Sequence, residues 1–188
     1  MTDKPITELV DFYLQRIIDF DINKLPRSIE QDMLDPMQET GEEWKKWLPL
    51  ESRVTDLEIE EFEGRIGHKL PSDYVFFLRY KHFYELNIGE GVMCEHPVNT
   101  WRASLSAMIY NGYPRKFLID KGLIPFAGMS DWGLLCFDTN RGYLNANYPV
   151  VLWDHEVVDW HIDYAPSFRM ALIRLDKDYK KRQETVDE

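Results

Sequence analysis

The hydrophobic pattern of this chain changes partway along its length, and this change limits the folds that the chain can adopt. In the first part, apolar residues recur three and four positions apart, which places them on one face of an α-helix. In the last third, they form short runs separated by Gly, Asn, Asp and Pro, the pattern of β-strands. We therefore predict an α+β single domain, with N-terminal helices packed on a mostly antiparallel or mixed sheet of about five to six strands and a C-terminal helix.

Two helices are predicted before residue 50. The segment Ile6–Phe20 has apolar residues at helical spacing with charged residues between them. The segment Glu42–Leu48 would place Trp44 and Trp47 on one helix face before Pro49 ends the pattern. We expect both indoles to dock on the core.

Three further helices are predicted between residues 55 and 110. The first begins with a capping box, because the Thr55 hydroxyl and the Glu58 carboxylate can both bond amides at the helix start. Gly67 ends this helix, and Ser72 is the predicted N-cap of the next one. The segment Asn99–Ile109 again shows helical spacing.

The apolar runs of the last third predict four strands, over Leu123–Phe126, Gly133–Phe137, Val150–Trp153 and Val157–Ile162. The second and third are apolar on both faces, as in central strands. In the fourth, Val158, Trp160 and Ile162 alternate with Asp159, His161 and Asp163, which is typical of a half-exposed strand near the edge of a sheet. Pro166 begins the C-terminal helix, and the charged tail Asp176–Glu188 is expected to fray.

The charge balance restricts the partners. The 188 residues include 33 acidic and 22 basic residues, a net charge of -11. Such a chain repels phosphate backbones and anionic lipids, so we expect no nucleic acid or membrane partner and favour a basic protein. Cys94 and Cys136 are interpreted as reduced thiols of a cytoplasmic protein, and neither a signal peptide nor a transmembrane helix is evident. The pattern leaves the oligomeric state open.

Three blocks of sequence carry a resemblance to a known group of proteins. The first is a capped helix, a glycine, Leu-Pro, an aromatic residue and a Phe-Leu pair, here Thr55, Glu58, Ile59, Glu63, Gly67, Leu70, Pro71, Tyr74, Phe77 and Leu78. The second is an Ile-Pro-Phe-Ala strand, a glycine turn and a strand ending in aspartate, here Ile124 to Ala127, Gly128, Asp131, Gly133, Phe137 and Asp138. The third comprises Pro149, Val150, Val151, Trp153, Asp154, His155 and Glu156.

Together these blocks, over about residues 44–174 of a single domain at 1–175, resemble the SUKH superfamily. This group joins bacterial toxin-immunity proteins to Smi/Knr-like regulators of fungal cell-wall glucan synthesis. The resemblance implies a protein-binding module that is not an enzyme and needs no metal or cofactor. One departure is Lys81–Tyr84, where the family usually has an Asn-Gly-Gly-like turn, and another is an apparent insertion at about residues 95–120.

A partner-binding cleft is predicted around the second and third blocks. Trp132 lies in a turn, where an exposed aromatic side chain suits an interface hot spot, although burial in the core is an equal alternative. The predicted partner-binding residues are Asp131, Trp132, Asp138, Trp153, Asp154 and Glu156. A second acidic patch would consist of Asp56, Glu60 and Glu63 on one helix face.

The alternative function is a metal-dependent hydrolase that uses Asp138, His155 and Asp159. We favour a polar turn and an exposed strand face instead, because His155 and His161 lack the helical spacing that fixes metal ligands locally. Cys94 and His96 supply only half of a zinc site. No resident metal is therefore expected.

Overall fold

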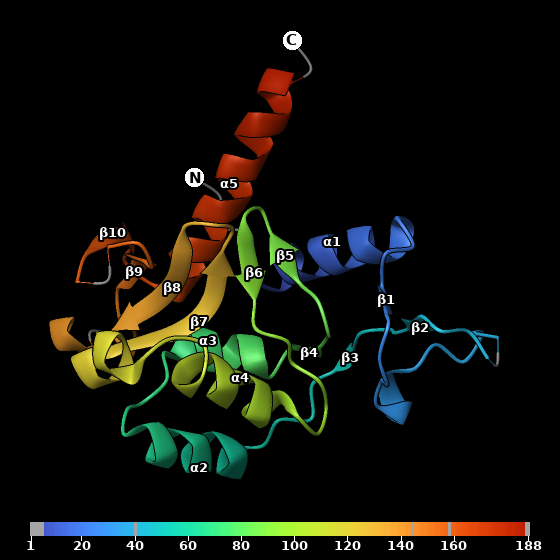
Figure 1. Cartoon of the computed structure of the whole chain (residues 1–188), viewed down its shortest axis with the longest axis horizontal. Helices are drawn as coiled ribbons and strands as arrows, with labels where there is room; N and C mark the ends of the chain where they lie inside the picture. Colours follow the sequence, from blue (N-terminus) through green and yellow to red (C-terminus); the bar gives the residue numbers. More distant parts are fainter. Residues whose placement is uncertain (1–5, 40, 144, 158, 187–188) are drawn as a thin grey trace.

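The computed structural model describes residues 6–39, 41–143, 145–157 and 159–186, and it confirms the α+β class. Its centre is a six-stranded sheet (Figure 1) formed by β5 (Asn87–Ile88), β6 (Gly91–Met93), β7 (Leu123–Met129), β8 (Gly133–Asp138), β9 (Val150–Asp154) and β10 (His161–Ala165). The spatial order is β10-β9-β8-β7-β6-β5, and every neighbouring pair is antiparallel. The edge strands are therefore β5 and β10, and the predicted edge position of the last strand is confirmed.

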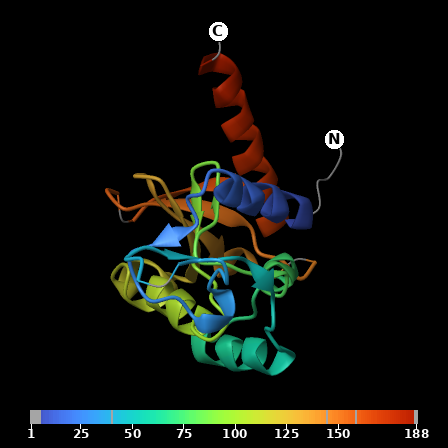
Figure 2. The ribbon, with the colours of Figure 1, turned by 90° about the vertical axis from the view of Figure 1, so that its right-hand side faces the viewer.

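The two terminal helices pack on the β5 edge. α1 (Ile6–Asp19) and α5 (Phe168–Val186) contact β5 and each other (Figure 2). The Tyr13 hydroxyl donates a hydrogen bond of 3.2 Å to Asp176. α1 supports the turn of α5 around Asp176 and Tyr179, and the helix continues to residue 186, where we predicted fraying; residues 187–188 lie outside the described chain. No helix in the described ranges combines the length and apolar character needed to cross a membrane.

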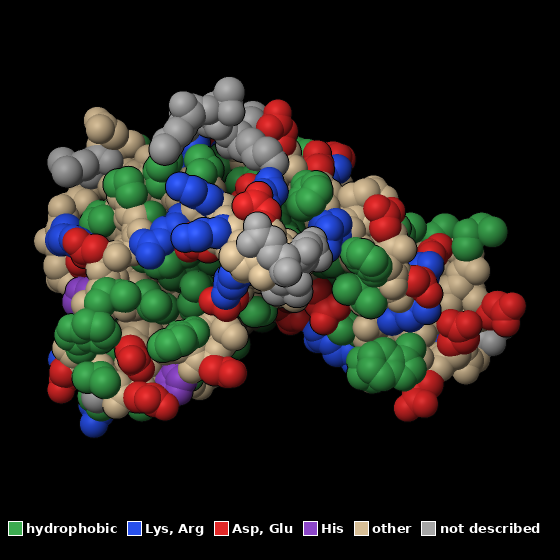
Figure 3. Space-filling view, turned by 90° about the horizontal axis from the view of Figure 1, so that it is seen from above, with side chains coloured by type: hydrophobic (Ala, Val, Ile, Leu, Met, Phe, Trp, Pro, Cys, Tyr) green, Lys and Arg blue, Asp and Glu red, His purple; other side chains and the backbone are tan. Residues whose placement is uncertain are grey.

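A lobe formed by residues 21–51 extends beside the sheet (Figure 3, right). It contains β1 (Lys24–Leu25), η1 (Gln31–Met33), β2 (Lys45–Lys46) and β3 (Leu50–Glu51); β1 pairs with β2, and β3 pairs with β4 (Lys81–His82). The predicted helix over Glu42–Leu48 is wrong. Trp44 lies in a bend before β2 and is 52% exposed, whereas Trp47 follows β2, bridges to Leu34 and is fully buried.

The middle helices are α2 (Asp56–Ile66), α3 (Ser72–Leu78) and α4 (Trp101–Tyr110). The capping box is confirmed, since Thr55 Oγ1 accepts from the Glu58 amide at 3.3 Å and the Glu58 carboxylate accepts from the Thr55 amide at 2.9 Å. Gly67 ends α2 in the left-handed conformation, at φ 74°. Ser72 is not the N-cap of α3 but its first residue, and Pro71 caps the helix without a side-chain bond.

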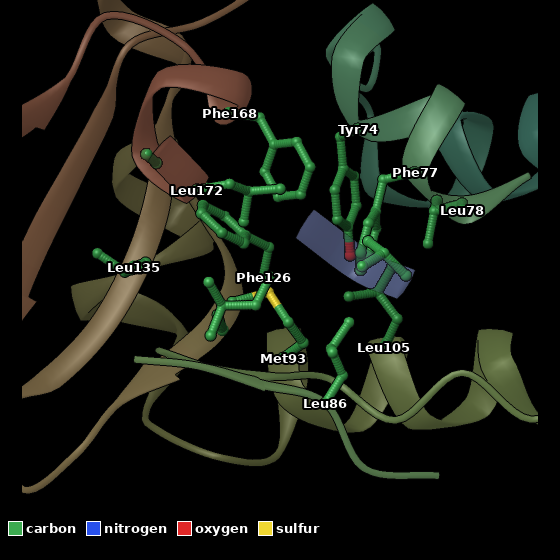
Figure 4. Packing of buried hydrophobic residues seen from close by; sticks show 14 of the residues in the cluster. Tyr74, Phe77, Leu78, Leu86, Met93, Leu105, Phe126, Leu135, Phe168 and Leu172 are labelled. Carbon is green, nitrogen blue, oxygen red and sulfur yellow. The ribbon is translucent and has the colours of Figure 1, made fainter. Parts of the chain in front are cut away.

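Aromatic side chains join the helices to one face of the sheet. Tyr74 and Phe77 of α3 contact Phe168 of α5, and Tyr74 also contacts Phe126 of β7 (Figure 4). The Phe126 ring stacks on Phe137 of β8, with centroids 4.4 Å apart. This cluster fixes α3 and α5 on the inner face of the sheet.

The other face is covered by the segment between α4 and β7, which contains η2 (Arg115–Phe117) and η3 (Ile119–Lys121). A smaller buried cluster lies here, formed by Leu118, Leu123, Leu134, Cys136, Val151 and Trp153. β8 and β9 thus contribute to clusters on both faces, as predicted for central strands.

Candidate functional site

The turn of the β7–β8 hairpin presents Trp132 to solvent. Met129 and Gly133 are paired across the hairpin, so Ser130, Asp131 and Trp132 form its loop. The Trp132 amide donates to the Met129 carbonyl at 2.9 Å. Its indole is 63% exposed, so the structure shows exposure rather than the alternative of burial in the core.

Gly133 holds this turn against the end of β9. Its φ is 147°, and a Cβ at this position would lie 1.9 Å from the carbonyl oxygen of Trp153. Only glycine allows such a close approach of the two backbones. The pairing places Asp154 directly opposite Gly133, so the beginning of β8 and the end of β9 lie side by side in close contact.

Three acidic residues accompany Trp132 at this end of the sheet. Asp131 and Glu156 are exposed. Asp154 is half-buried, and its Oδ1 accepts from the Glu156 amide at 2.8 Å. On the side of the molecule that carries β8–β10, hydrophobic side chains gather with acidic and histidine side chains (Figure 3, left). We call Asp131, Trp132, Asp154 and Glu156 the hairpin surface.

Asp138, also predicted to bind a partner, lies at the opposite end of β8 and is 4% exposed. Its Oδ1 accepts from the Asn140 amide at 3.0 Å, and its Oδ2 accepts from Arg141 Nε at 2.8 Å. A buried carboxylate needs such partners. Asp138 therefore holds η4 (Thr139–Arg141) after β8 and does not join the hairpin surface.

Trp153, the remaining predicted site residue, is buried at 1% exposure. Its ring meets Tyr113 edge-on, with centroids 5.0 Å apart. Because the side chains of successive strand residues point to opposite faces, Trp153 packs on the outer face. It anchors the backbone from which Asp154 projects.

Further exposed apolar side chains lie near this surface. Val157 and Trp160 are 53% and 51% exposed, and Ile162 is 38% exposed. The predicted half-exposed strand over Val157–Ile162 included these residues and Val158, which is outside the described residues. β10 begins only at His161, and Trp160 lies in a turn in which its amide donates to the Val157 carbonyl at 2.8 Å. An apolar run alone did not distinguish this turn from a strand.

The carboxylates predicted as a second acidic patch have different surroundings. Glu63 is buried, and it accepts hydrogen bonds from the Leu70 amide at 2.8 Å and Lys69 Nζ at 2.6 Å. Asp56 pairs with Arg79. Only Glu60 among the three is exposed without a described ion pair, so α2 does not present an open row of carboxylates.

The residues of the hydrolase alternative are engaged in other contacts. Asp138 is bonded to Arg141, and Asp159 pairs with Lys121 at 2.6 Å. The Lys121 ammonium lowers the pKa of Asp159. Within residues 6–39, 41–143, 145–157 and 159–186, no group of three or more His, Cys, Asp or Glu could hold a metal ion. His155 is therefore not part of a preformed ligand set.

The family comparison covers the segments that build this site. The model of the SMI1 / KNR4 family (SUKH-1) matches residues 53–174, which include α2, the β7–β8 hairpin and β9. No curated protein matches the chain in sequence. The matched range is more than half of the chain and contains the capped helix, the glycine turn and the Trp-Asp-His-Glu segment. On this basis, the chain belongs to the SMI1/KNR4 family of the SUKH superfamily.

Proposed function

We propose that this chain is a non-enzymatic module that binds a basic protein through the hairpin surface. The observation that carries the proposal is the exposure of Trp132 on a turn that Gly133 packs closely against β9. A large exposed indole gains much from burial in a partner, and a side chain with only two rotatable bonds loses little conformational entropy on binding. Tryptophan is correspondingly enriched among interface hot spots.

Charge supports the choice of a basic partner. Asp131 and Glu156 are exposed beside the indole, and the whole chain carries a net charge of -11. Opposite charges speed the encounter and select the partner, whereas the buried aromatic contact slows dissociation. The buried Trp153 and Asp138 have positioning roles in this proposal.

Family membership suggests two biological settings. The first is an immunity-type protein that neutralises a toxin, and the second is a Smi/Knr-like regulator of glucan synthesis. We favour the immunity role, because one compact acidic and aromatic surface suits a single basic partner. A regulator that acts as an assembly platform would need several surfaces.

The test is a pull-down from the source cells with the tagged full chain, washed at low and at high salt and analysed by mass spectrometry. We expect one basic partner whose capture falls about tenfold or more with Trp132→Ala. Asp131→Asn should mainly weaken capture at low salt, because screening removes the benefit of exposed charge. Trp44→Ala is the matched control, since Trp44 is also exposed but lies in the distant lobe.

The outcomes separate the alternatives. A single basic and toxic polypeptide establishes the immunity role, and several wall-synthesis or signalling proteins favour the regulator. Equal capture by wild type and Trp132→Ala removes the hairpin surface from consideration. Activity that appears only with added metal and disappears with Asp159→Asn would favour the hydrolase.

A further inference from the structure

A cavity of about 190 Å³ opens at the β5 edge of the sheet, away from the hairpin surface. It lies between α1, the segment that follows α1, the β5–β6 hairpin and α5. Most of its lining is apolar or aromatic and includes Ile17, Phe20, Ile22 and Tyr179. Two polar side chains, Arg16 and Asn87, also line it.

The Arg16 guanidinium is held in place by aromatic rings. Its Cζ lies 5.3 Å from the Phe20 ring centroid, 5.7 Å from that of Phe12 and 5.8 Å from that of Tyr179. Its Nη2 donates to the Tyr179 hydroxyl at 3.0 Å. A guanidinium has five N–H donors, so this arrangement positions the charge while leaving donors for a ligand.

Three other arginines, Arg27, Arg115 and Arg174, also lie over an aromatic ring and pair with a carboxylate, whereas Arg16 has no acidic partner among the described residues. In the described part of the chain, no carboxylate oxygen lies within 4.0 Å of its guanidinium. Asp19, one turn further along α1, accepts from Gln15 instead. Arg27 also lies over a tyrosine ring, 5.4 Å from the Tyr84 centroid, but it pairs with Glu95. In a chain with 33 acidic residues, an arginine without a carboxylate beside an apolar cavity has the composition of an anion site.

We propose that this cavity binds an apolar carboxylate. The ligand would carry one aromatic or branched aliphatic group, either as a free organic acid or as the last residue of a peptide. The hydrocarbon would lie between Ile17 and Ile22, and the carboxylate would accept hydrogen bonds from Arg16 and Asn87. The size is suitable, because a cavity of about 150 Å³ can hold a benzene molecule.

Most of the cavity is lined by residues that lie outside the family match. Arg16, Phe20 and Ile22 precede residue 53, and Tyr179 follows residue 174. Only the β5–β6 hairpin is supplied by the matched range. Carboxylate binding would therefore be a property added to the family domain, separate from the hairpin surface.

The test is an NMR titration of the full chain, labelled with ¹⁵N, against 3-phenylpropionate and its uncharged amide. We expect the acid to shift amide signals of α1, the β5–β6 hairpin and α5, and the amide to bind much more weakly. Arg16→Gln should weaken binding about tenfold or more, since a hydrogen bond between charged groups is lost. Arg27→Gln is the matched control and should leave binding unchanged.

One further variant and one further ligand complete the test of carboxylate binding. Ile22→Ala changes a side chain that is 59% exposed, so the fold should persist while affinity falls a few-fold. A short peptide that ends in phenylalanine, as free acid and as amide, separates the peptide source from the small acid. Equal binding of acid and amide, no effect of Arg16→Gln, or no shifts at millimolar concentration would overturn the proposal. Trp132→Ala should have no effect, so failure here leaves the proposed function intact.

Discussion

The two edges of the six-stranded sheet are finished in different ways. At the β5 edge, α1 and α5 lie against the sheet, and Gly89 approaches Leu175 so closely that a Cβ would lie 2.7 Å from the Leu175 carbonyl oxygen. At the β10 edge, no further strand is paired in the described chain, and Trp160 and Ile162 are exposed. The covered edge depends on segments outside residues 53–174, whereas the open edge and the hairpin surface lie within that range. In the proposed function, the open edge serves recognition, while α1 and the turns of α5 after residue 174 cover the other edge.

Trp153→Ala should strongly destabilise the protein, because the side chain of Trp153 is buried although exposed residues such as Trp160 lie near it at the open edge. Trp153 is 1% exposed and contacts Tyr113. We expect the free energy of unfolding to fall by about 3–5 kcal/mol, from lost burial and the cavity left behind. Urea denaturation followed by circular dichroism measures this change. Trp160→Ala is the control and should change stability by less than about 0.5 kcal/mol; similar losses for both would contradict the comparison.

Gly89→Ala should weaken the covered edge by pushing the β5–β6 hairpin away from α5. Gly89 has φ 61°, and an added Cβ would meet Leu175 backbone atoms. Strain at positive φ and the clash together should cost about 2–4 kcal/mol. Gly67→Ala isolates the strain at positive φ, because Gly67 is left-handed at φ 74° but has nothing within 4 Å of a Cβ. A loss of about 1–2 kcal/mol in both variants would mean that the hairpin is not pressed against α5 in solution.

Local signals in the sequence predicted much of this architecture. The Thr55 capping box and Gly67 gave the limits of α2 because the groups that satisfy a helix end lie within a few residues. β8 and β9 were recognisable because strands buried on both faces are apolar throughout. The sequence also identified Trp132 as a turn residue, but it did not decide between exposure and burial.

The wrong predictions depended on contacts between distant segments. Trp44 and Trp47 have helical spacing, but the two residues between them, Lys45 and Lys46, pair with β1 as a strand. The charged end of α5 was expected to fray, yet Tyr13 of α1 bonds to it from 163 residues away in sequence. Asp138 was grouped with Asp131 because both belong to one motif, although they lie at opposite ends of β8. Spacing along the chain does not reveal such long-range contacts.

A buried histidine pair outside the six-stranded sheet should make stability depend on pH. His82 of β4 and His96 are 0% and 2% exposed, and their Nδ1 atoms lie 3.1 Å apart. Burial lowers the pKa of both imidazoles, and the charge of His82 lowers that of His96 further. Between the ordinary value of about 6.5 and these lowered values, the unfolded chain binds more protons. Stability is therefore complete above about pH 6.5 and falls as the pH is lowered through this window.

The expected loss between pH 7.5 and pH 5 is about 1–2 kcal/mol, measured by urea denaturation at each pH. Stopping at about pH 5 avoids most carboxylate protonation, which begins below that value. His96→Phe keeps a ring beside Trp101, where the histidine ring lies 5.4 Å away, and removes one titrating group. This variant should show a smaller slope with pH; an unchanged slope would assign the acid sensitivity to other groups.

Trp132→Ala should have the smallest effect on stability and therefore gives the sharpest test of the open edge. Its indole is 63% exposed, and the turn is held by the close packing of Gly133 on β9 rather than by the indole. The free energy of unfolding should change by less than about 0.5 kcal/mol, while capture of the basic partner falls about tenfold or more. A loss of stability near that of Trp153→Ala would mean that Trp132 packs against the protein in solution and is not available to a partner. Unchanged stability with reduced capture would separate recognition from folding at this edge, whereas the contacts of the β5 edge affect folding directly.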